Sequence, residues 1–184
     1  NSFDPLKYTF GLSSFDAPNA GVVLQTPDYA ADIFQRLYEC ETRSCLRCYI
    51  QIQNDINANM RALLVDWLVD VHTKLRLCSE SLHLAVNIVD RYLMSAQVDK
   101  SELQLVGVTS LLLASKYEDV YPPSVKDCVL LTARAYTKQE VIDMELMIVK
   151  ELDFNLTVVT CYPFLQRFFL ITNAANIVQS AATY

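Results

Sequence analysis

Three cysteines lie close together in the sequence and could support metal or redox chemistry. Cys45 and Cys48 form a Cys-x-x-Cys pair, and Cys40 lies just before them. A zinc site needs about four ligands, but neither His72 nor His83 is near these cysteines in the sequence. The alternative is that the cysteines are reduced thiols of a cytosolic or nuclear protein, and the pattern favours this second interpretation.

The sequence offers little else that could catalyse a reaction. Asp66 and Asp70 are four residues apart, which would place both carboxylates on one face of a helix, as a general acid and base require. Such pairs are also routine on solvated helix faces, where their repulsion costs little. The sequence contains no Gly-rich phosphate loop and no Gly-x-Ser-x-Gly elbow. We therefore predict a non-catalytic protein that holds neither a metal nor another cofactor.

The composition limits the class of protein further. The 184 residues carry a net charge of −6, and 52% of them are hydrophobic while only 20% are charged. This apolar content can fold a core, which argues against disorder, and the acidity argues against a nucleic-acid partner. We find neither a transmembrane segment nor a signal peptide, so no membrane partner is expected. Because the hydrophobic fraction is high for a soluble monomer, we expect part of it to face a protein partner.

Helical periodicity begins near residue 28 and accounts for most of the remaining chain. We expect an extended leader over 1–27, then an N-terminal helix and a linker over 28–58. Five helical patterns follow within 59–156, and a sixth begins at Tyr162 after a linker. The five patterns cover 60–77, 80–96, 101–117, 125–134 and 137–152.

The pattern over 101–117 differs from the others because it is apolar almost all round. Neighbours on several sides bury such a helix, so we predict an all-α domain around one central helix. Gly107, Ser110 and Ala114 form a stripe of small residues on it, where another helix can approach closely. Two residue pairs predict capping boxes at helix starts: Ser101 with Gln104, and Thr137 with Glu140.

Several short motifs in these helices resemble one known family. Residues 60–68 read Met-Arg-Ala-Leu-Leu-Val-Asp-Trp-Leu, which closely resembles the signature of the cyclin box. Further matches occur, in family order, at 103–109, 114–118, 121–123, 136–138 and 144–145. Together they resemble an A-type or B-type mitotic cyclin, with the B type favoured. The resemblance implies a cyclin-box five-helix bundle around a central helix, preceded by an N-terminal helix and followed by the start of a second repeat.

This resemblance implies a regulatory subunit rather than an enzyme. Cyclins bind a cyclin-dependent Ser/Thr kinase and hold its C helix inward, which activates the kinase in cell-cycle (G2/M) control. Five residues that typify the box are present: Arg61, Asp90, Leu105, Lys116 and Glu145. The first two are expected to form a structural ion pair. Lys116 and Glu145 are expected to lie at the kinase interface. The alternative for each pair is a buried bridge that meets no partner.

Apolar residues around Lys116 and Glu145 are also expected to contact the kinase. Tyr117, Phe154 and Leu156 match the family's apolar contacts, although each could instead pack in the core. Tyr29 and Ile33 belong to a segment that resembles the family's N-terminal helix, which packs across the box and also touches the kinase.

A second surface is implied for substrates. In related cyclins, substrates and inhibitors with an Arg-x-Leu motif dock in a shallow patch between the first and third helices of the box. The matching residues are Met60, Leu63, Leu64, Trp67 and Gln104, with Asp70 as the partner of the motif's arginine. The alternative is that these apolar residues form an ordinary core stripe and that Gln104 only caps its helix.

Residues 157–184 are expected to be a linker and the truncated start of the second cyclin repeat. The sequence opens on Asn1 rather than Met, so we expect a fragment of a longer protein, located in the nucleus and cytoplasm. The uncharged tail over 168–184 would then expose surface meant for that repeat. A DNA-binding or peptide-binding protein of the same fold is a competing class, and the net charge of −6 disfavours the nucleic-acid branch of it.

Overall fold

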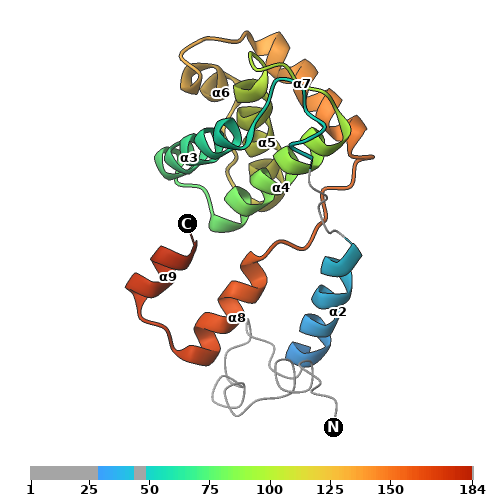
Figure 1. Cartoon of the computed structure of the whole chain (residues 1–184). Coiled ribbons are helices and arrows are strands. Elements are labelled where there is room, and N and C mark those ends of the chain that lie inside the picture. The colour runs from blue at the N-terminus through green and yellow to red at the C-terminus, as the bar shows by residue number, and fades with distance from the viewer. Residues whose placement is uncertain (1–28, 44–48, 184) are drawn as a thin grey trace. The chain divides into compact units, whose positions relative to one another are not determined.

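The computed structural model describes residues 29–43 and 49–183 (Figure 1). Eight α-helices and no strand occur in these two ranges, so the predicted all-α class is confirmed. The helices are α2 (Ala30–Arg43), α3 (Ala58–Leu75), α4 (Ser79–Ser95), α5 (Leu103–Glu118), α6 (Val125–Leu131), α7 (Lys138–Glu151), α8 (Tyr162–Thr172) and α9 (Asn176–Thr183).

The chain divides into two compact units, which we describe separately. One unit is Leu46–Thr160 and contains α3 to α7. The other combines Asn1–Cys45 with Cys161–Tyr184 and contains α2, α8 and α9. The leader expected over 1–27 lies outside the described residues. None of the helices in the described ranges has both the length and the apolar content to cross a membrane.

Helix α5 is the central helix of the unit Leu46–Thr160. Twelve of its 16 residues are buried, and it packs against α3, α4, α6 and α7 (Figure 1). Leu111 and Leu112 are each only 1% exposed. Full burial of one such side chain contributes about 1.5–3 kcal/mol. The prediction of a helix that neighbours bury on several sides is therefore confirmed.

Helix α3 approaches α5 closely at Gly107. A Cβ atom added at this glycine would lie 2.6 Å from Cδ1 of Leu64 on α3, and 3.2 Å from its Cγ. Leu64 is itself buried, and its side chain would have to shift to admit a methyl group at position 107. The missing side chain at Gly107 is therefore what allows α3 to pack directly on the central helix, as the small-residue stripe predicted.

The predicted capping box at the start of α7 is confirmed. Glu140 N donates to Oγ1 of Thr137 at 3.2 Å, and Thr137 N donates to a carboxylate oxygen of Glu140 at 2.7 Å. The hydroxyl of Thr137 also donates to this carboxylate at 2.6 Å, and the bonds from the hydroxyl and from the backbone N–H of Thr137 lower the pKa of Glu140. A second capping box, Ser124 with Asp127, opens α6 and was not predicted.

The capping box predicted for Ser101 and Gln104 is wrong. The N-cap residue of α5 is Glu102, which makes no side-chain capping bond. A turn occupies these positions instead, because Glu102 N donates to the carbonyl of Asp99 at 2.9 Å. Tyr136 Oη also donates to the carbonyl of Ser101 at 2.6 Å. This tyrosine is distant in the sequence, so local spacing could not have indicated the contact.

Helix α6 ends earlier than the 125–134 pattern predicted. Ala133 and Arg134 have left-handed backbones, with φ of 52° and 63°. Their N–H groups donate back to the carbonyls of Leu130 and Val129 at 3.0 and 2.9 Å. Such bonds satisfy the last carbonyls of a helix and terminate it.

In the other unit, α2 and α8 meet through aromatic side chains. The rings of Phe34 and Phe164 have centroids 6.2 Å apart and are tilted by 54°. The guanidinium of Arg167 lies 5.2 Å from the centroid of Phe34, where the face of the ring attracts a cation. Helix α8 begins at Tyr162 as predicted, whereas α9 was not predicted because polar residues obscure its period.

The contact between Gly107 and Leu64 generates a prediction about stability. Gly107→Ala gains about 1 kcal/mol in helix propensity, but overpacking a filled site costs about 1–3 kcal/mol. A Leu64→Ala background has room for the added methyl group. We therefore expect Gly107→Ala to lower the free energy of unfolding of the unaltered chain by at least about 1 kcal/mol more than it does in that background. Urea unfolding of the four variants measures this coupling, and additive effects would contradict the close contact.

Candidate functional site

Arg61 on α3 and Asp90 on α4 form a bidentate ion pair. Nε and Nη2 of Arg61 donate to the two carboxylate oxygens of Asp90, each at 2.6 Å. Tyr49 Oη donates to the same carboxylate at 2.5 Å. Burial and then the bond to Asp90 raise the pKa of Tyr49, and the bond to Asp90 raises the pKa of Arg61. Tyr49 and Arg61 therefore keep their protons, and their hydrogen bonds to the Asp90 carboxylate join α3, α4 and the segment before α3.

Residues considered for metal or acid–base chemistry do not form such a site where the structure describes them. In the described ranges, no group of three or more His, Cys, Asp or Glu side chains could hold a metal ion. Cys45 and Cys48 lie outside those ranges. Burial raises the pKa of Cys128 to about 11, so this thiol stays protonated at neutral pH. Asp66 and Asp70 are both exposed on α3, as solvated carboxylates commonly are.

Lys116 near the end of α5 and Glu145 on α7 form an ion pair at the surface. Nζ of Lys116 lies 2.5 Å from Oε1 of Glu145. The side chains are 44% and 20% exposed, so the pair is not the buried bridge of the alternative interpretation. An exposed pair contributes only about 0–1 kcal/mol to stability. Both groups can therefore turn from each other to a partner at little cost.

Two aromatic side chains at or just beyond the ends of the helices that carry this pair are exposed. Tyr117 follows Lys116, and its Oη lies 2.5 Å from Oγ1 of Thr157. Phe154 is 73% exposed and has a φ of 58°, which is unusual for a bulky residue. Leu156 is only partly exposed and packs against the hydrophobic core, as its alternative interpretation held.

Hydrogen bonds hold the backbone that carries Phe154. Arg91 Nη1 donates to the carbonyl of Asn155 at 2.8 Å. Phe154 N donates to the carbonyl of Val149 at 2.9 Å, which closes the end of α7. The Tyr117 to Thr157 bond holds the far side of the segment. The exposed ring is therefore presented on an ordered backbone, which lowers the entropic cost of binding a partner.

More apolar side chains are exposed in this unit than the sequence analysis identified. They lie in the loop after α5 and on the outer face of α7: Val120, Tyr121, Ile142 and Leu146. The signal for α7 was available, because Ile142 and Leu146 are four residues apart and so share a face, and Ile142 lies about one turn before Glu145. The loop residues have no periodicity that could have indicated their exposure.

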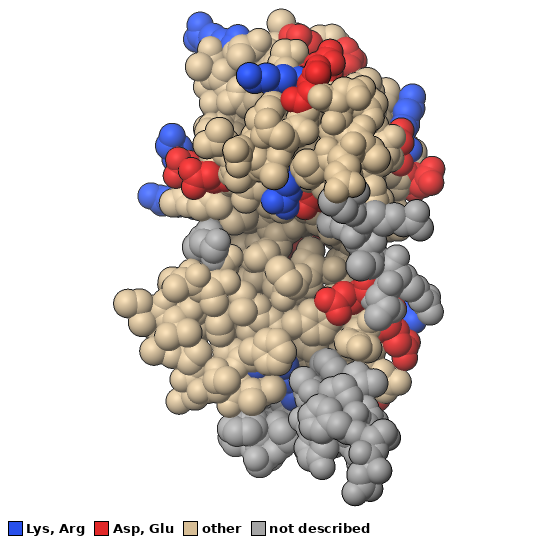
Figure 2. Space-filling view, in the orientation of Figure 1, with Lys and Arg blue, Asp and Glu red and all other residues tan. Residues whose placement is uncertain are grey.

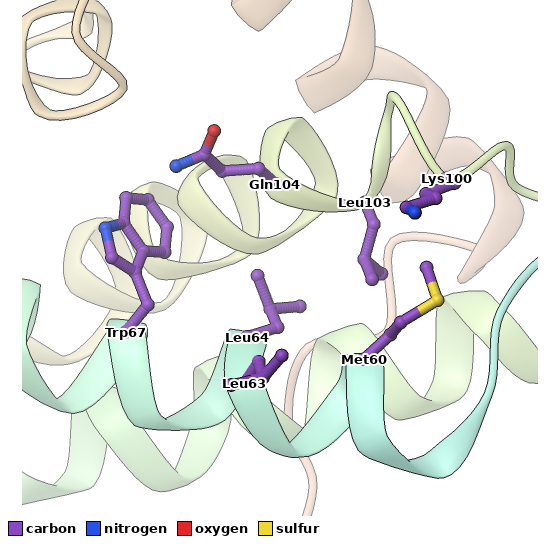
Figure 3. Close-up of a pocket in the computed structure, with 7 residues that line it drawn as sticks. All are labelled: Met60, Leu63, Leu64, Trp67, Lys100, Leu103 and Gln104. Carbon is purple, nitrogen blue, oxygen red and sulfur yellow. The ribbon is translucent and has the colours of Figure 1, made fainter.

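Helices α3 and α5 also form an apolar groove of about 250 Å³ (Figure 3). Its lining residues are Met60, Leu63, Leu64, Trp67, Lys100, Leu103 and Gln104. Leu64 is buried, whereas Leu63 is 70% exposed and could meet a partner directly. Met60 and Trp67 are partly exposed and also pack against the core. The structure thus brings together all the predicted docking residues except Asp70.

The ends of the groove differ from the sequence-based expectation. Asp70 is exposed on α3 three residues beyond Trp67, but it does not line the groove. Lys100 and Leu103 do line it, and Figure 3 shows them near Met60, at the end away from Trp67. These two residues precede or begin α5, so the period of α3 could not have identified them.

The unit that contains α2, α8 and α9 also carries exposed apolar side chains. Tyr29 directly precedes α2 and Ile33 lies near its start, and both are exposed. In Figure 2, the surface formed by α8 and α9 is almost entirely uncharged on the face in view. Helix α9 has no buried residue.

These features describe an all-helical domain with two surfaces suited to protein partners, and comparison identifies its family. Residues 32–157 match the family model described as cyclin, N-terminal domain, so the chain belongs to the cyclin family. Cyclin-B2-1 of Oryza sativa subsp. japonica is 45% identical over 158 residues, which are 85% of this chain and 38% of that protein. Cyclin-A2 of Gallus gallus is 44% identical over 170 residues, which are 92% of this chain and 42% of that protein.

The comparisons confirm the resemblance to mitotic cyclins. The G2/mitotic-specific cyclin-1 of Medicago sativa subsp. varia is 44% identical over 170 residues, covering 92% of this chain and 40% of that protein. The chain thus spans about two fifths of the length of these relatives. The X-ray structure of a viral cyclin from herpesvirus saimiri has the same fold, with a TM-score of 0.68. It is 24% identical, and the match covers 83% of this chain and 65% of the viral protein.

Proposed function

We propose that this chain is a non-catalytic regulatory subunit that binds and activates a cyclin-dependent Ser/Thr kinase in G2/M control. The observation that carries the proposal is the exposed ion pair of Lys116 and Glu145, together with the exposed side chains of Tyr117 at the end of α5 and Phe154 just beyond α7. Membership of the cyclin family supports the same conclusion. We expect the protein to act in the nucleus and cytoplasm.

The chemistry of this surface suits capture of a helix. The ammonium of Lys116 can donate to backbone carbonyls, and the carboxylate of Glu145 can accept from backbone N–H groups. Burial of Phe154 and its apolar neighbours would supply most of the binding energy, because aromatic side chains dominate interface hot spots. A kinase C helix held there would keep its glutamate paired with the ATP-binding lysine, which is the active arrangement.

Two further contacts belong to the proposal. Tyr29 and Ile33 are exposed apolar residues at the start of α2, and we assign them to the kinase as well. Leu156 is the weakest member of the set, because it also packs in the core. Its substitution would mix a loss of stability with any loss of binding.

Removal of the ion pair tests the kinase proposal. We expect Lys116→Ala with Glu145→Ala to weaken kinase binding by about tenfold or more, which corresponds to about 1.4 kcal/mol. Activation of the kinase should fall with it, while the free energy of unfolding changes by no more than about 1 kcal/mol. Calorimetric titration with the kinase and a phosphorylation assay measure the two effects.

A matched control is available on the same helix. Asp143→Ala with Lys150→Ala also removes one anion and one cation, but these residues lie about 150° around α7 from Glu145. We expect this variant to bind and activate normally. If the folded Lys116 and Glu145 variant does so too, the assignment of the interface is wrong.

We further propose that the groove between α3 and α5 recruits substrates that carry an Arg-x-Leu motif. The motif's leucine would occupy the groove beside Leu63 and Trp67, and its arginine would reach the carboxylate of Asp70 beyond Trp67. The exposure of Leu63 supports this, because an apolar side chain that points into solvent gains free energy when a partner covers it.

Binding of a synthetic Arg-x-Leu peptide tests this second proposal. We expect Leu63→Ser to weaken binding of the peptide by about tenfold. The protein should lose no stability, since Leu63 is exposed. Trp67→Ala should weaken peptide binding as well, although part of that side chain packs in the core. Leu130→Ser removes an exposed leucine from α6 and should have no effect. Fluorescence titrations measure these affinities. If the Leu63 and Trp67 variants bind the peptide as tightly as the unaltered protein does, these residues belong only to the core and the docking proposal is wrong.

A further inference from the structure

Arg91 on α4 makes a contact that crosses 64 residues of sequence. Its Nη1 donates to the carbonyl of Asn155 at 2.8 Å. The side chain is partly buried, and this burial lowers the pKa of Arg91. Within the described ranges it forms no ion pair, so no carboxylate offsets the loss of water around the guanidinium. The bond to the Asn155 carbonyl is the interaction that holds this cation in place.

The carbonyl that Arg91 binds follows a strained backbone. Asp153 and Phe154 have left-handed conformations, with φ of 50° and 58°. Such conformations are costly for residues other than glycine and persist only where the surroundings fix them. Phe154 N donates to the carbonyl of Val149 at 2.9 Å, but this bond reaches only α7 itself. Arg91 adds a contact from a second helix directly after the strained pair.

The part of α4 that carries Arg91 is itself fixed. Asp90 accepts two hydrogen bonds from Arg61 on α3, each at 2.6 Å. Val89 and Leu93 are fully buried in the core. Because packed interiors are close to rigid, a side chain anchored here is held relative to the whole bundle. Arg91 therefore fixes the segment after α7 against the core, and not only against α7.

We infer that Arg91 is a positioning residue for the kinase surface, because its bond to the Asn155 carbonyl holds the strained segment in the conformation that presents Phe154. This inference rests on the proposed kinase-binding function and adds a residue that need not touch the kinase. Without the bond, the left-handed residues can relax and the exposed ring samples several directions. Binding then includes the cost of ordering the ring again, which lowers the affinity.

Calorimetric titration of variants with the kinase tests this inference. Arg91→Met keeps the apolar stem but removes every donor, and we expect it to weaken kinase binding about threefold to tenfold, as loss of one hydrogen bond does. Arg91→Lys keeps a donor and should recover most of the affinity. Arg134→Met removes an exposed arginine after α6 and should bind normally. Should the methionine variant not fold, Arg91→Gln repeats the test with a shorter polar side chain.

A double-mutant cycle with Phe154→Ala separates positioning from other roles. If Arg91 acts through the ring, its substitution loses its effect once the ring is absent. Arg91→Met should therefore change the affinity by less than about twofold in a Phe154→Ala background. An equal loss in both backgrounds would overturn the inference, since Arg91 would then touch the kinase itself or act through overall stability.

Residue-resolved hydrogen exchange of the unbound protein reports on the segment itself. The amides of Phe154 and Asn155 are bonded back to α7, and Arg91→Met should make them exchange faster. The amides of α5 should exchange as before, which distinguishes a local change from a general loss of stability. Unchanged exchange at positions 154 and 155 would contradict the positioning role.

The outcomes separate the inference from the proposal beneath it. If Phe154→Ala weakens kinase binding but the folded Arg91→Met variant binds normally, only the inference fails. If the unaltered protein does not bind the kinase, or Phe154→Ala binds as tightly as the unaltered protein, the proposed interface itself fails.

Discussion

The burial of α5 is the constraint on which the rest of the larger unit depends. An apolar helix without a solvated face folds only if neighbours cover every side, and α3, α4, α6 and α7 do so. The approach of α3 is possible because position 107 is a glycine. Arg61 and Asp90 then join α3 to α4 at the edge of this packing, where one of the two side chains stays partly exposed.

Burial of the middle of α5 brings its two ends to the surface, where they contribute to different sites. Gln104 lines the groove near the start of the helix, and Lys116 pairs with Glu145 near its end. Twelve residues of helix separate them, which is about 18 Å. Because a packed helix is rigid, it would hold a substrate in the groove at a fixed distance from a kinase bound at the ion pair. In the proposed function, such a scaffold would recruit a substrate at one end of α5 and bind the kinase at the other.

The features that the sequence predicted correctly are those that depend on the periodicity of a single helix. It identified the central helix, the small-residue stripe at Gly107 and the capping box of Thr137, because each follows from neighbours within one or two turns. It failed where residues distant in the sequence decide the outcome. Ser101 does not cap α5, because it lies inside a turn from Asp99 to Glu102 and Glu102 is the N-cap residue, while Tyr136 binds the carbonyl of Ser101. Lys100 was missed for a related reason, since a groove between two elements is not a property of either pattern alone. The exposure of Phe154 followed only from the resemblance, and its left-handed backbone follows from no pattern.

Hydrogen exchange measured by mass spectrometry, with and without a cyclin-dependent kinase, tests the central claim most directly. Val120 and Tyr121 follow α5, which carries Lys116, and residues 156–158 follow α7, which carries Glu145. Both segments lie outside the helices, so their amides should exchange measurably in the unbound protein. We predict that the kinase slows exchange in both segments and leaves α6 unchanged. Unaltered exchange in both segments, in a complex shown to form, would contradict the proposed interface.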